Sequence, residues 1–597
     1  MLQKTLSVQC ENILPIIKKW LYSSHDIFLR ELISNACDAI KKLRILTGET
    51  EDLRIDLHID KEKKTLTISD QGLGMTEEEV ERYIAQIAFS GAEEFLSKYQ
   101  TDQEAMIGHF GLGFYSAYMV ASHVELQTRS YLPDARPVHW SCDGSSKYEI
   151  GEGEREERGT DVILHLDEAH LEYLDESSLR FHILRFCGFM PESIYLNGIS
   201  LETTTPIWLK PASDCTDREY ISFYRKLFPL EPDPLFWIHL NIDYPFNLKG
   251  ILYLPKVQRR FEEQNGSIRL FCNRVFVSDH CREILPDYLT MLRGAIDSID
   301  LPLNVSRSTL QMDQNVKQLA AHISKKISDR LNLLFKNDRA HYCTLWPDLE
   351  ILVKLGFLQD DKFYDRVRDI LIWKTDKQEW VTVQELLDHS TEKKIYYTSE
   401  ETSLSLQKAF IDRGCRLLYA GSPIDSAVMN ALERKLPSVK FQRIDSALDE
   451  KLIDASREKG ILDAEGKTVS SRIAQLFKTH LDEQLEVEAK SLSSDELVGV
   501  FLLDENSRRL RDYLAITQGN AELSPFGKKT FVVNTNSKLV QMAYKMAEKK
   551  PQVAEGLIRQ IYDLTRLAQK EVDPKEIDQL VSREQSLLEQ LTSLYLS

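Results

Sequence analysis

Apolar side chains recur at helical spacing near the start of the chain. Residues 12–46 predict two helices, the second running from about Asp26 to Leu43, because its apolar residues fall on one arc at ~100° per residue. That arc consists of Phe28, Leu29, Leu32, Ile33, Ala36, Ala39 and Ile40. We therefore expect the second helix to pack one face on a core and to keep a polar margin beside it.

Strand-like alternation of apolar and polar residues follows. It predicts strands at Leu53–Ile59, Thr65–Ser69, His123–Arg129 and Gly159–Leu166. A helix should begin at Thr76, because this threonine and a glutamate three residues later fit a capping box. The chain to about residue 200 is therefore predicted to combine helices with a sheet.

The remaining sequence predicts further α/β units. Aromatic residues are dense between residues 206 and 256, and residues 268–277 read as one strand. Residues 340–450 contain the short apolar runs LEILVKLGF, KIYYT and CRLLYAG between helices, and the chain is helix-rich from about residue 470. At about 150 residues per domain, 597 residues correspond to roughly four units.

Charge and cysteine content exclude several classes of function. The net charge is −18, which argues against broad binding to nucleic acid or to an anionic membrane. The nine cysteines are scattered without a C-x-x-C pair, and the first residues lack an apolar signal-peptide core, so we expect a cytoplasmic protein with free thiols. The most apolar stretch, residues 110–121, is too short to span a bilayer. The fourteen histidines show no pair at metal-ligand spacing on a predicted helix.

Polar residues of a distinctive kind lie at the margin of the second helix. Glu31, Asn35 and Asp38 fall within a stripe roughly 60° wide beside the apolar arc. A solvated helix edge is the ordinary explanation for acidic residues in such a place. However, a carboxylate one turn from an amide also suits a magnesium ion and an attacking water.

Two glycine-containing loops follow the predicted strands. The sequence DQGLGM at residues 70–75 lets a flat ring approach the backbone, while Asp70 can accept a hydrogen bond from an exocyclic amine; alone, this is also an ordinary turn. The sequence GHFGLGF at residues 108–114 opens an apolar helical run, and a helix N-terminus there would attract phosphate. Neither a Walker A loop nor a Rossmann loop matches this order of elements.

Four segments in this order resemble the GHKL ATPases, the superfamily of gyrase, the ninety-kilodalton heat-shock chaperones, histidine kinases and mismatch-repair ATPases. They are FLRELISNACDA (28–39), SDQGLGM (69–75), IGHFGLGFYSAYMVA (107–121) and ERGTDVILHL (157–166). A fifth segment, ILPDYLTMLRGAIDSIDLPLNVSRSTLQ (284–311), is similar to the heat-shock chaperones alone. The chain therefore resembles the bacterial branch of that chaperone family over essentially its whole length.

The resemblance implies a multidomain α/β fold. Residues 1–203 should form an N-terminal Bergerat-type α/β sandwich that binds ATP, and residues 204–455 an α/β middle domain with a catalytic arginine loop. Residues 470–597 should form a helix-rich α/β C-terminal dimerisation domain.

The resemblance also assigns residue roles around the phosphates of ATP. Glu31 should be the general base for the hydrolytic water, with Arg30 as its partner. Asn35 should supply the Mg²⁺ ligand, and Asp38 should belong to the same nucleotide-binding stripe.

For the adenine, the resemblance makes Asp70 the acceptor for the amino group, with Gly74 and Thr160 linked to it through water. Met75 and Phe114 should flank the ring.

A lid over residues 89–113 should carry the hinge and phosphate-loop glycines, which are Gly108, Gly111 and Gly113. From the middle domain, Arg307 should reach the γ-phosphate, with Asn304 and Gln311 supporting its loop.

The chain departs from the family pattern near the lid and the arginine. Phe89 stands where the family usually has a lysine, and Ala92 where it has a threonine. Tyr83 replaces a usual asparagine, and Ser308 replaces the glutamate that commonly follows the arginine. We expect these changes to alter nucleotide affinity and cycling without removing ATPase activity.

The C-terminal sequence predicts two amphipathic helices. Val553, Leu557, Ile561, Leu564 and Ala568 mark one apolar face. A second helix should start at Asp573, Pro574 and Glu576 and carry the apolar residues Ile577, Leu580, Val581, Leu587, Leu588, Leu591, Leu594 and Tyr595. These faces could pack on strands near residues 498–503 and 530–533, but the surplus of apolar surface, with the resemblance, favours a parallel homodimer.

The function predicted from the sequence is an ATP-dependent clamp that binds non-native or late-folding proteins. A signalling kinase of the same superfamily would need a phosphoacceptor histidine on a dimerising helix ahead of the nucleotide domain. A DNA-handling ATPase would need a basic track. A nucleotide-binding scaffold without turnover is the remaining alternative, and measurable ATP hydrolysis would exclude it.

Overall fold

The structure is a computed structural model in which two compact units are distinguished, Met1–Ile327 and Ser328–Ser597. Each unit is described by itself. The residues described are 24–49, 51–86, 89, 111–244, 247–256, 267–279, 281, 284–301, 314–388, 393–399, 403–457, 468–482, 485–509, 529–569, 571–572 and 576–596.

An eight-stranded sheet organises the first part of the first unit, in the order β5-β4-β3-β6-β2-β1-β7-β8. All neighbours are antiparallel except β1 and β7. The strands are β1 (Arg54–Asp60), β2 (Thr65–Asp70), β3 (Ala121–Arg129), β4 (Val138–Cys142), β5 (Glu149–Glu152), β6 (Gly159–Leu166), β7 (Ser193–Leu196) and β8 (Ile199–Ser200). The four strands predicted from alternation are thereby confirmed.

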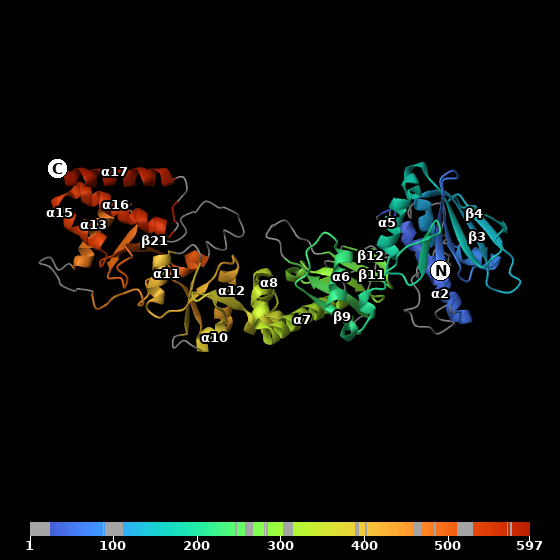
Figure 1. The fold of residues 1–597 in the computed structure, drawn as a ribbon, viewed down its shortest axis with the longest axis horizontal. Coiled ribbons are helices and arrows are strands. Elements are labelled where there is room, and N and C mark those ends of the chain that lie inside the picture. Colours follow the sequence, from blue (N-terminus) through green and yellow to red (C-terminus); the bar gives the residue numbers. More distant parts are fainter. Residues whose placement is uncertain are drawn as a thin grey trace, which may run out of the picture. The chain divides into compact units, whose positions relative to one another are not determined.

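Helix α2 (Ile27–Thr47) packs on β2 and on the helix α5 (Glu176–Cys187), as Figure 1 shows. Its predicted apolar arc is buried, with Phe28, Leu29, Ile33 and Ile40 fully enclosed. Burial of each such side chain is worth about 1.5–3 kcal/mol, which fixes the face that α2 turns to the sheet. The polar margin of α2 is therefore held at the edge of the core.

Two short helical segments complete this layer. Helix α3 (Glu77–Tyr83) begins with the predicted capping box, in which Thr76 and Glu79 exchange hydrogen bonds.

The run after the glycine loop was predicted to be an apolar helix with a phosphate-attracting N-terminus. The structure instead forms a 3-10 helix, η3 (Gly113–Met119), which gives way to β3 within two residues. The element is therefore a 3-10 helix rather than the longer helix predicted, and the phosphate site at its N-terminus stays a prediction.

A five-stranded sheet follows within the first unit, in the order β12-β11-β13-β10-β9. Its strands and the helices near it are η5 (Ile207–Leu209), η6 (Ala212–Asp214), α6 (Asp217–Leu227), β9 (Phe236–Ile242), β10 (Leu248–Leu254), β11 (Ile268–Cys272), β12 (Val275–Ser278), η8 (Asp287–Leu289) and β13 (Arg293–Asp297). The 3-10 helix η4 (Glu168–Leu174) belongs to the preceding part, where it contacts β2 and α5. The single strand predicted for residues 268–277 is a hairpin, because Asn273 and Arg274 both adopt positive φ and turn the chain back. The half-buried carboxylate of Asp297 accepts the backbone N–H of Arg274 and holds this turn.

Helix α7 (Gln314–Asn337) ends in the second unit, where a five-stranded sheet has the order β15-β14-β17-β16-β18. Its elements are α8 (Arg339–Gln359), α9 (Asp361–Val367), η9 (Arg368–Ile370), β14 (Ile372–Thr375), β15 (Trp380–Thr382), α10 (Val383–Asp388), β16 (Lys394–Thr398), α11 (Leu404–Ile411), β17 (Leu417–Tyr419), α12 (Asp425–Lys435) and β18 (Lys440–Arg443). The runs KIYYT and CRLLYAG contain strands, whereas LEILVKLGF lies inside α8. An apolar run of this length fits a buried helix as well as a strand, which explains the ambiguity.

A three-stranded sheet, β19-β21-β20, carries the last helices of the second unit. The elements are α13 (Val469–His480), β19 (Glu486–Lys490), β20 (Gly499–Leu503), β21 (Lys529–Asn534), α15 (Lys538–Lys549), α16 (Pro551–Ala568) and α17 (Ile577–Leu596). Helix α16 lies against β20 and beside α17 (Figure 1). Among the described residues, no helix combines the length and apolar composition that crossing a membrane requires.

Candidate functional site

The polar margin of α2 carries an ion pair. Arg30 donates to Oε1 of Glu31 from Nε at 3.0 Å and from Nη2 at 2.8 Å. The Arg30 side chain is 2% exposed and that of Glu31 is 14% exposed, so the pair is shielded from bulk water. The predicted pairing of these residues is present, and it leaves Oε2 as the carboxylate oxygen not engaged by this arginine.

That second oxygen faces the glycine that opens η3. An ideal Cβ built on Gly113 would lie 2.9 Å from Oε2 of Glu31 and 3.7 Å from Nδ2 of Asn35. A side chain at residue 113 would therefore collide with the glutamate, and the glycine lets the loop approach α2 closely. The structure thus brings Glu31, Asn35 and Gly113 together, while Asp38, one turn further along α2, is 6% exposed.

Asp70 ends β2 beneath the turn that follows. Its carboxylate is buried, at 6% exposure for the residue, and Oδ1 accepts the backbone N–H of Gly72 at 2.7 Å. Burial raises the pKa of Asp70 to about 7, and the Gly72 N–H opposes that rise. A carboxyl group whose pKa lies this far above its ordinary value is typical of a functional position rather than of a solvated turn.

A hydroxyl network connects the turn to the neighbouring strands. The backbone N–H of Met75 donates to Oγ1 of Thr128 at 3.0 Å, and that hydroxyl lies 3.0 Å from Oγ1 of Thr160. Thr160 is also the cross-strand partner of Asp70. Thr128 was not among the predicted site residues; it is fully buried in the structure, and no local signal in the sequence marks it out from any other strand threonine.

Gly74 fits the same tight packing. It adopts a φ of +61°, and a Cβ there would lie 1.8 Å from the carbonyl oxygen of Arg129. A larger residue would push the turn away from β3, and with it the N–H of Met75.

Arg155 is a second residue that sequence reasoning missed. It lies in the charged segment GEGEREERG at residues 151–159. In the structure, Nη2 of Arg155 donates to the backbone carbonyl of Asp70 at 2.9 Å, and its Nη1 pairs with Asp161. The arginine therefore ties the end of β2 to β6.

Two of the departures from the family pattern contact each other. The rings of Tyr83 and Phe89 are stacked, with centroids 6.0 Å apart and an interplanar angle of 23°. The guanidinium of Arg82 lies 5.7 Å from the Tyr83 centroid and 5.2 Å from the Phe89 centroid. The backbone of Gly111 also approaches Phe89, since a Cβ there would lie 2.5 Å from its carbonyl oxygen. The two substitutions thus form one aromatic and cationic contact at the base of the predicted lid.

The remaining predicted residues divide into two groups. Phe114 is 7% exposed and packs edge-to-face on Trp140 at 5.7 Å, so its ring is largely enclosed by the core. Outside the described residues lie Gly108, Asn304, Arg307, Ser308, Gln311 and most of the predicted lid.

The described residues fit a nucleotide with its magnesium ion. Glu31 Oε2 and the Nδ2 of Asn35 both lie near Gly113, so the carboxylate is placed as a base beside an amide whose oxygen is a hard ligand. The buried carboxyl group of Asp70, whose pKa is about 7, offers an oxygen that can accept a hydrogen bond from an adenine amino group.

Comparisons with known proteins support this interpretation. The family described as "Hsp90 protein" matches residues 193–594, and the family "Histidine kinase-, DNA gyrase B-, and HSP90-like ATPase" matches residues 22–176. "Chaperone protein HtpG" of Porphyromonas gingivalis is 41% identical over 90% of this chain and 83% of that protein. The protein of the same name in Bacteroides thetaiotaomicron is 40% identical over 90% and 83%, and that of Myxococcus xanthus is 30% identical over 93% and 90%.

Proposed function

The chain belongs to the Hsp90 family of ATP-dependent chaperones, and from that premise we propose that it works as a dimeric clamp that hydrolyses ATP while it holds non-native protein. Its N-terminal part carries an ATPase domain of the GHKL type. The observation that carries the proposal is the meeting of Glu31 Oε2 and Asn35 with the Gly113 backbone, which supplies a base beside a metal-ligand amide. A cytoplasmic setting belongs to the proposal, because the described cysteines are free thiols.

In the proposed mechanism, Arg30 fixes one oxygen of Glu31, so that the other is aimed at a water beside the γ-phosphate and accepts its proton. The amide oxygen of Asn35 would hold the metal ion. Mg²⁺, when bound, would neutralise the charge that gathers on the phosphates. Asp70 binds the adenine, with Thr128 and Thr160 ordering the groups around it.

The direct test of this function combines two assays on the purified full-length chain. ATP turnover should be measurable and should change when an unfolded protein is added, and the chain should suppress the aggregation of that protein in an ATP-dependent manner. Turnover that is absent under all conditions would support a nucleotide-binding scaffold instead.

Arg307 should act from the proposed middle domain, residues 204–455, on the nucleotide bound in residues 1–203. We expect Arg307→Ala to reduce kcat by roughly 10³-fold, because a guanidinium delivered to a transferring phosphoryl group stabilises its transition state. ATP affinity, measured by calorimetry, should stay within about threefold of wild type. Arg307→Lys is the matched control and should recover only part of the rate, since lysine keeps the charge but loses the planar fork. Loss of affinity in parallel with rate would contradict the role.

The proposed homodimer rests on α17, in the proposed dimerisation domain, residues 470–597. Leu580 and Leu587 are buried against the unit, so the intramolecular packing anticipated from the sequence exists in part. Beside that buried stripe, Ile577, Val581 and Leu588 are 44%, 47% and 61% exposed. At ~100° per residue these three lie within about 40° of one another, which forms one apolar stripe. An exposed stripe of this kind is typical of a helix that completes a bundle with another copy.

We expect the double variant Val581→Asp with Leu588→Asp to be monomeric by light scattering at micromolar concentration, since it places two charges in an apolar contact. Ser586→Asp is the matched control: residue 586 is exposed, lies on the opposite side of α17, and its charge should leave the dimer intact. ATP affinity should be retained in both variants. A wild-type chain that is monomeric, or a double variant that stays dimeric, would refute this interface.

A further inference from the structure

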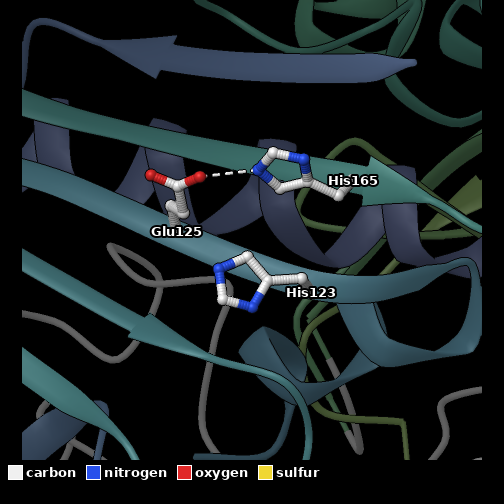
Figure 2. Close-up of side chains that lie close together, drawn as sticks. All are labelled: His123, Glu125 and His165. Carbon is white, nitrogen blue, oxygen red and sulfur yellow. Dashed lines mark hydrogen bonds and ion pairs between the residues drawn. The ribbon is translucent and has the colours of Figure 1, made fainter. Parts of the chain in front are cut away.

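A cluster of imidazoles and a carboxylate lies on the outer face of the eight-stranded sheet. His123 and Glu125 on β3 and His165 on β6 place one ligand atom each so that all three atoms lie within 4.8 Å of one another. Figure 2 shows Glu125 and His165 joined by a hydrogen bond, with the ring of His123 beside them. The sequence did not reveal this group, because its members lie on two neighbouring strands and not at metal-ligand spacing along one helix.

Strand register produces the cluster. His123 is the cross-strand partner of His165, and Glu125 is two residues further along β3, so all three side chains share one face. The alternate residues Val124 and Leu126 are buried on the opposite face. That opposite face also carries Thr128 and Thr160, so the cluster is separated from the nucleotide site by the thickness of the sheet.

The distances suit a small cation. Nε2 of His165 lies 2.6 Å from Oε1 of Glu125, and Nε2 of His139 on β4 lies 3.2 Å from the other carboxylate oxygen. The rings of His123 and His165 have centroids 5.3 Å apart. Ligand atoms around tetrahedral zinc lie about 3.3 Å from one another, given bonds of about 2.0 Å, so small side-chain rotations would bring these atoms into place.

The local charge also favours a cation. Glu125 is the carboxylate of the cluster, and His165 and His139 lie within hydrogen-bond distance of its two oxygens. Asp143 is also near enough to interact electrostatically with His123. Two carboxylates therefore accompany the imidazoles.

We propose that His123, Glu125 and His165 form a binding site for a divalent transition-metal ion such as Zn²⁺, with His139 orienting the carboxylate from the other side. Imidazole nitrogen with one carboxylate oxygen is a ligand set that zinc accepts, and it differs from the all-oxygen environment that Mg²⁺ prefers. The metal replaces the hydrogen-bonded proton between Glu125 and His165 and ties β3 to β6. The site is partly exposed, with side chains of Glu125 and His165 at 27% and 35%, so the ion enters directly from solvent.

The test is a titration of the full-length chain, stripped of metal and kept reduced with a non-thiol reductant, in competition with a chromophoric zinc chelator. Wild type should bind one Zn²⁺ that His123→Gln, His165→Gln and Glu125→Gln each weaken by at least tenfold, the range typical for loss of a ligand or its support. His58→Gln is the matched control, because His58 is an exposed histidine of β1 in the same sheet and outside the cluster. Its Zn²⁺ affinity should equal that of wild type.

Two further readouts separate this site from the thiols and from misfolding. Co²⁺ bound in place of Zn²⁺ should give visible ligand-field bands without a thiolate charge-transfer band. Zn²⁺ should raise the melting temperature of wild type and of His58→Gln but not of the three cluster variants, whose metal-free melting temperatures and ATP affinities should match wild type. Glu125→Gln keeps the size of the side chain and remains informative if a histidine variant is unstable. Equal Zn²⁺ affinity in wild type and cluster variants, or a thiolate band, would overturn the proposal.

Discussion

Glu31→Gln should reduce ATP hydrolysis by about 10²-fold or more while ATP affinity stays within about threefold of wild type. Glutamine keeps the length of the side chain and an oxygen that Arg30 can still bind, so the buried guanidinium is not deprived of its acceptor. What the substitution removes is the capacity of the atom facing Gly113 to accept a proton. Single-turnover hydrolysis and calorimetric binding measure the two effects separately.

A second ion pair of α2 provides the control for this variant. Arg44 donates to the buried carboxylate of Glu192 at 2.8 Å, away from the nucleotide site. Glu192→Gln therefore weakens a comparable helix-anchoring pair without touching the proposed base, and its kcat should remain near that of wild type. The general-base role fails if Glu31→Gln turns over ATP within threefold of wild type, or if Glu192→Gln loses as much activity.

Local sequence signals located most elements of the nucleotide-binding part. The apolar arc of α2, the alternation in β1, β2, β3 and β6, and the capping box of α3 each depend on residues within a few positions of one another. Periodicity and capping are set by such short-range geometry, so they can be read directly from the chain. The adjacency of Glu31 and Asn35 was predictable for the same reason, because residues four apart lie on one side of a helix.

Features that depend on contacts distant in sequence were missed. The hairpin at Asn273 and Arg274 needs a left-handed turn that the Asp297 carboxylate stabilises from another strand. Arg155 reaches the Asp70 backbone across 85 positions, and Thr128 joins Met75 to Thr160 only when β2, β3 and β6 are in register. Sheet order and register are determined by the tertiary packing, so no local sequence pattern predicts these contacts.

Two of the departures from the family pattern contact each other in the structure, which the sequence alone did not show. Tyr83 and Phe89 were expected to alter nucleotide affinity and cycling. Their stacking under Arg82 shows that the two aromatic residues supply a contact to each other. Such a pair is worth about 0.5–1.5 kcal/mol beyond the area it buries, enough to bias the position of the chain around residue 89.

Asp70→Asn should abolish detectable ATP binding, a loss of about 10²-fold or more, while leaving the fold intact. Oδ1 of Asp70 is fixed by the Gly72 N–H at 2.7 Å, so an asparagine keeps its oxygen there and must place its NH₂ group where the second carboxylate oxygen was. An adenine amino group would then meet a donor instead of an acceptor, and a buried, unpaired donor costs about 1–3 kcal/mol on each side.

Protein stability distinguishes this loss of recognition from misfolding. The folded-state pKa of Asp70, about 7, lies above its ordinary value of 3.8, so the folded state binds more protons than the unfolded state between these values. The stability contributed by this group is therefore present at low pH and is lost as the pH rises toward and through 7. Asparagine does not ionise, so Asp70→Asn should be at least as stable as wild type at pH 8, with a smaller decline in melting temperature between pH 6 and 8.

The control for this variant is Asp56→Asn, which changes a partly exposed carboxylate of the adjacent strand β1 that is paired with Arg54. This substitution should leave both ATP affinity and the pH dependence of melting unchanged. Calorimetry that finds wild-type ATP affinity in Asp70→Asn would exclude the adenine-acceptor role. A variant that melts well below wild type at pH 8 would show instead that the ionised carboxylate supports the fold, and the loss of binding would then have to be assigned to the altered turn at Gly72 and Gly74.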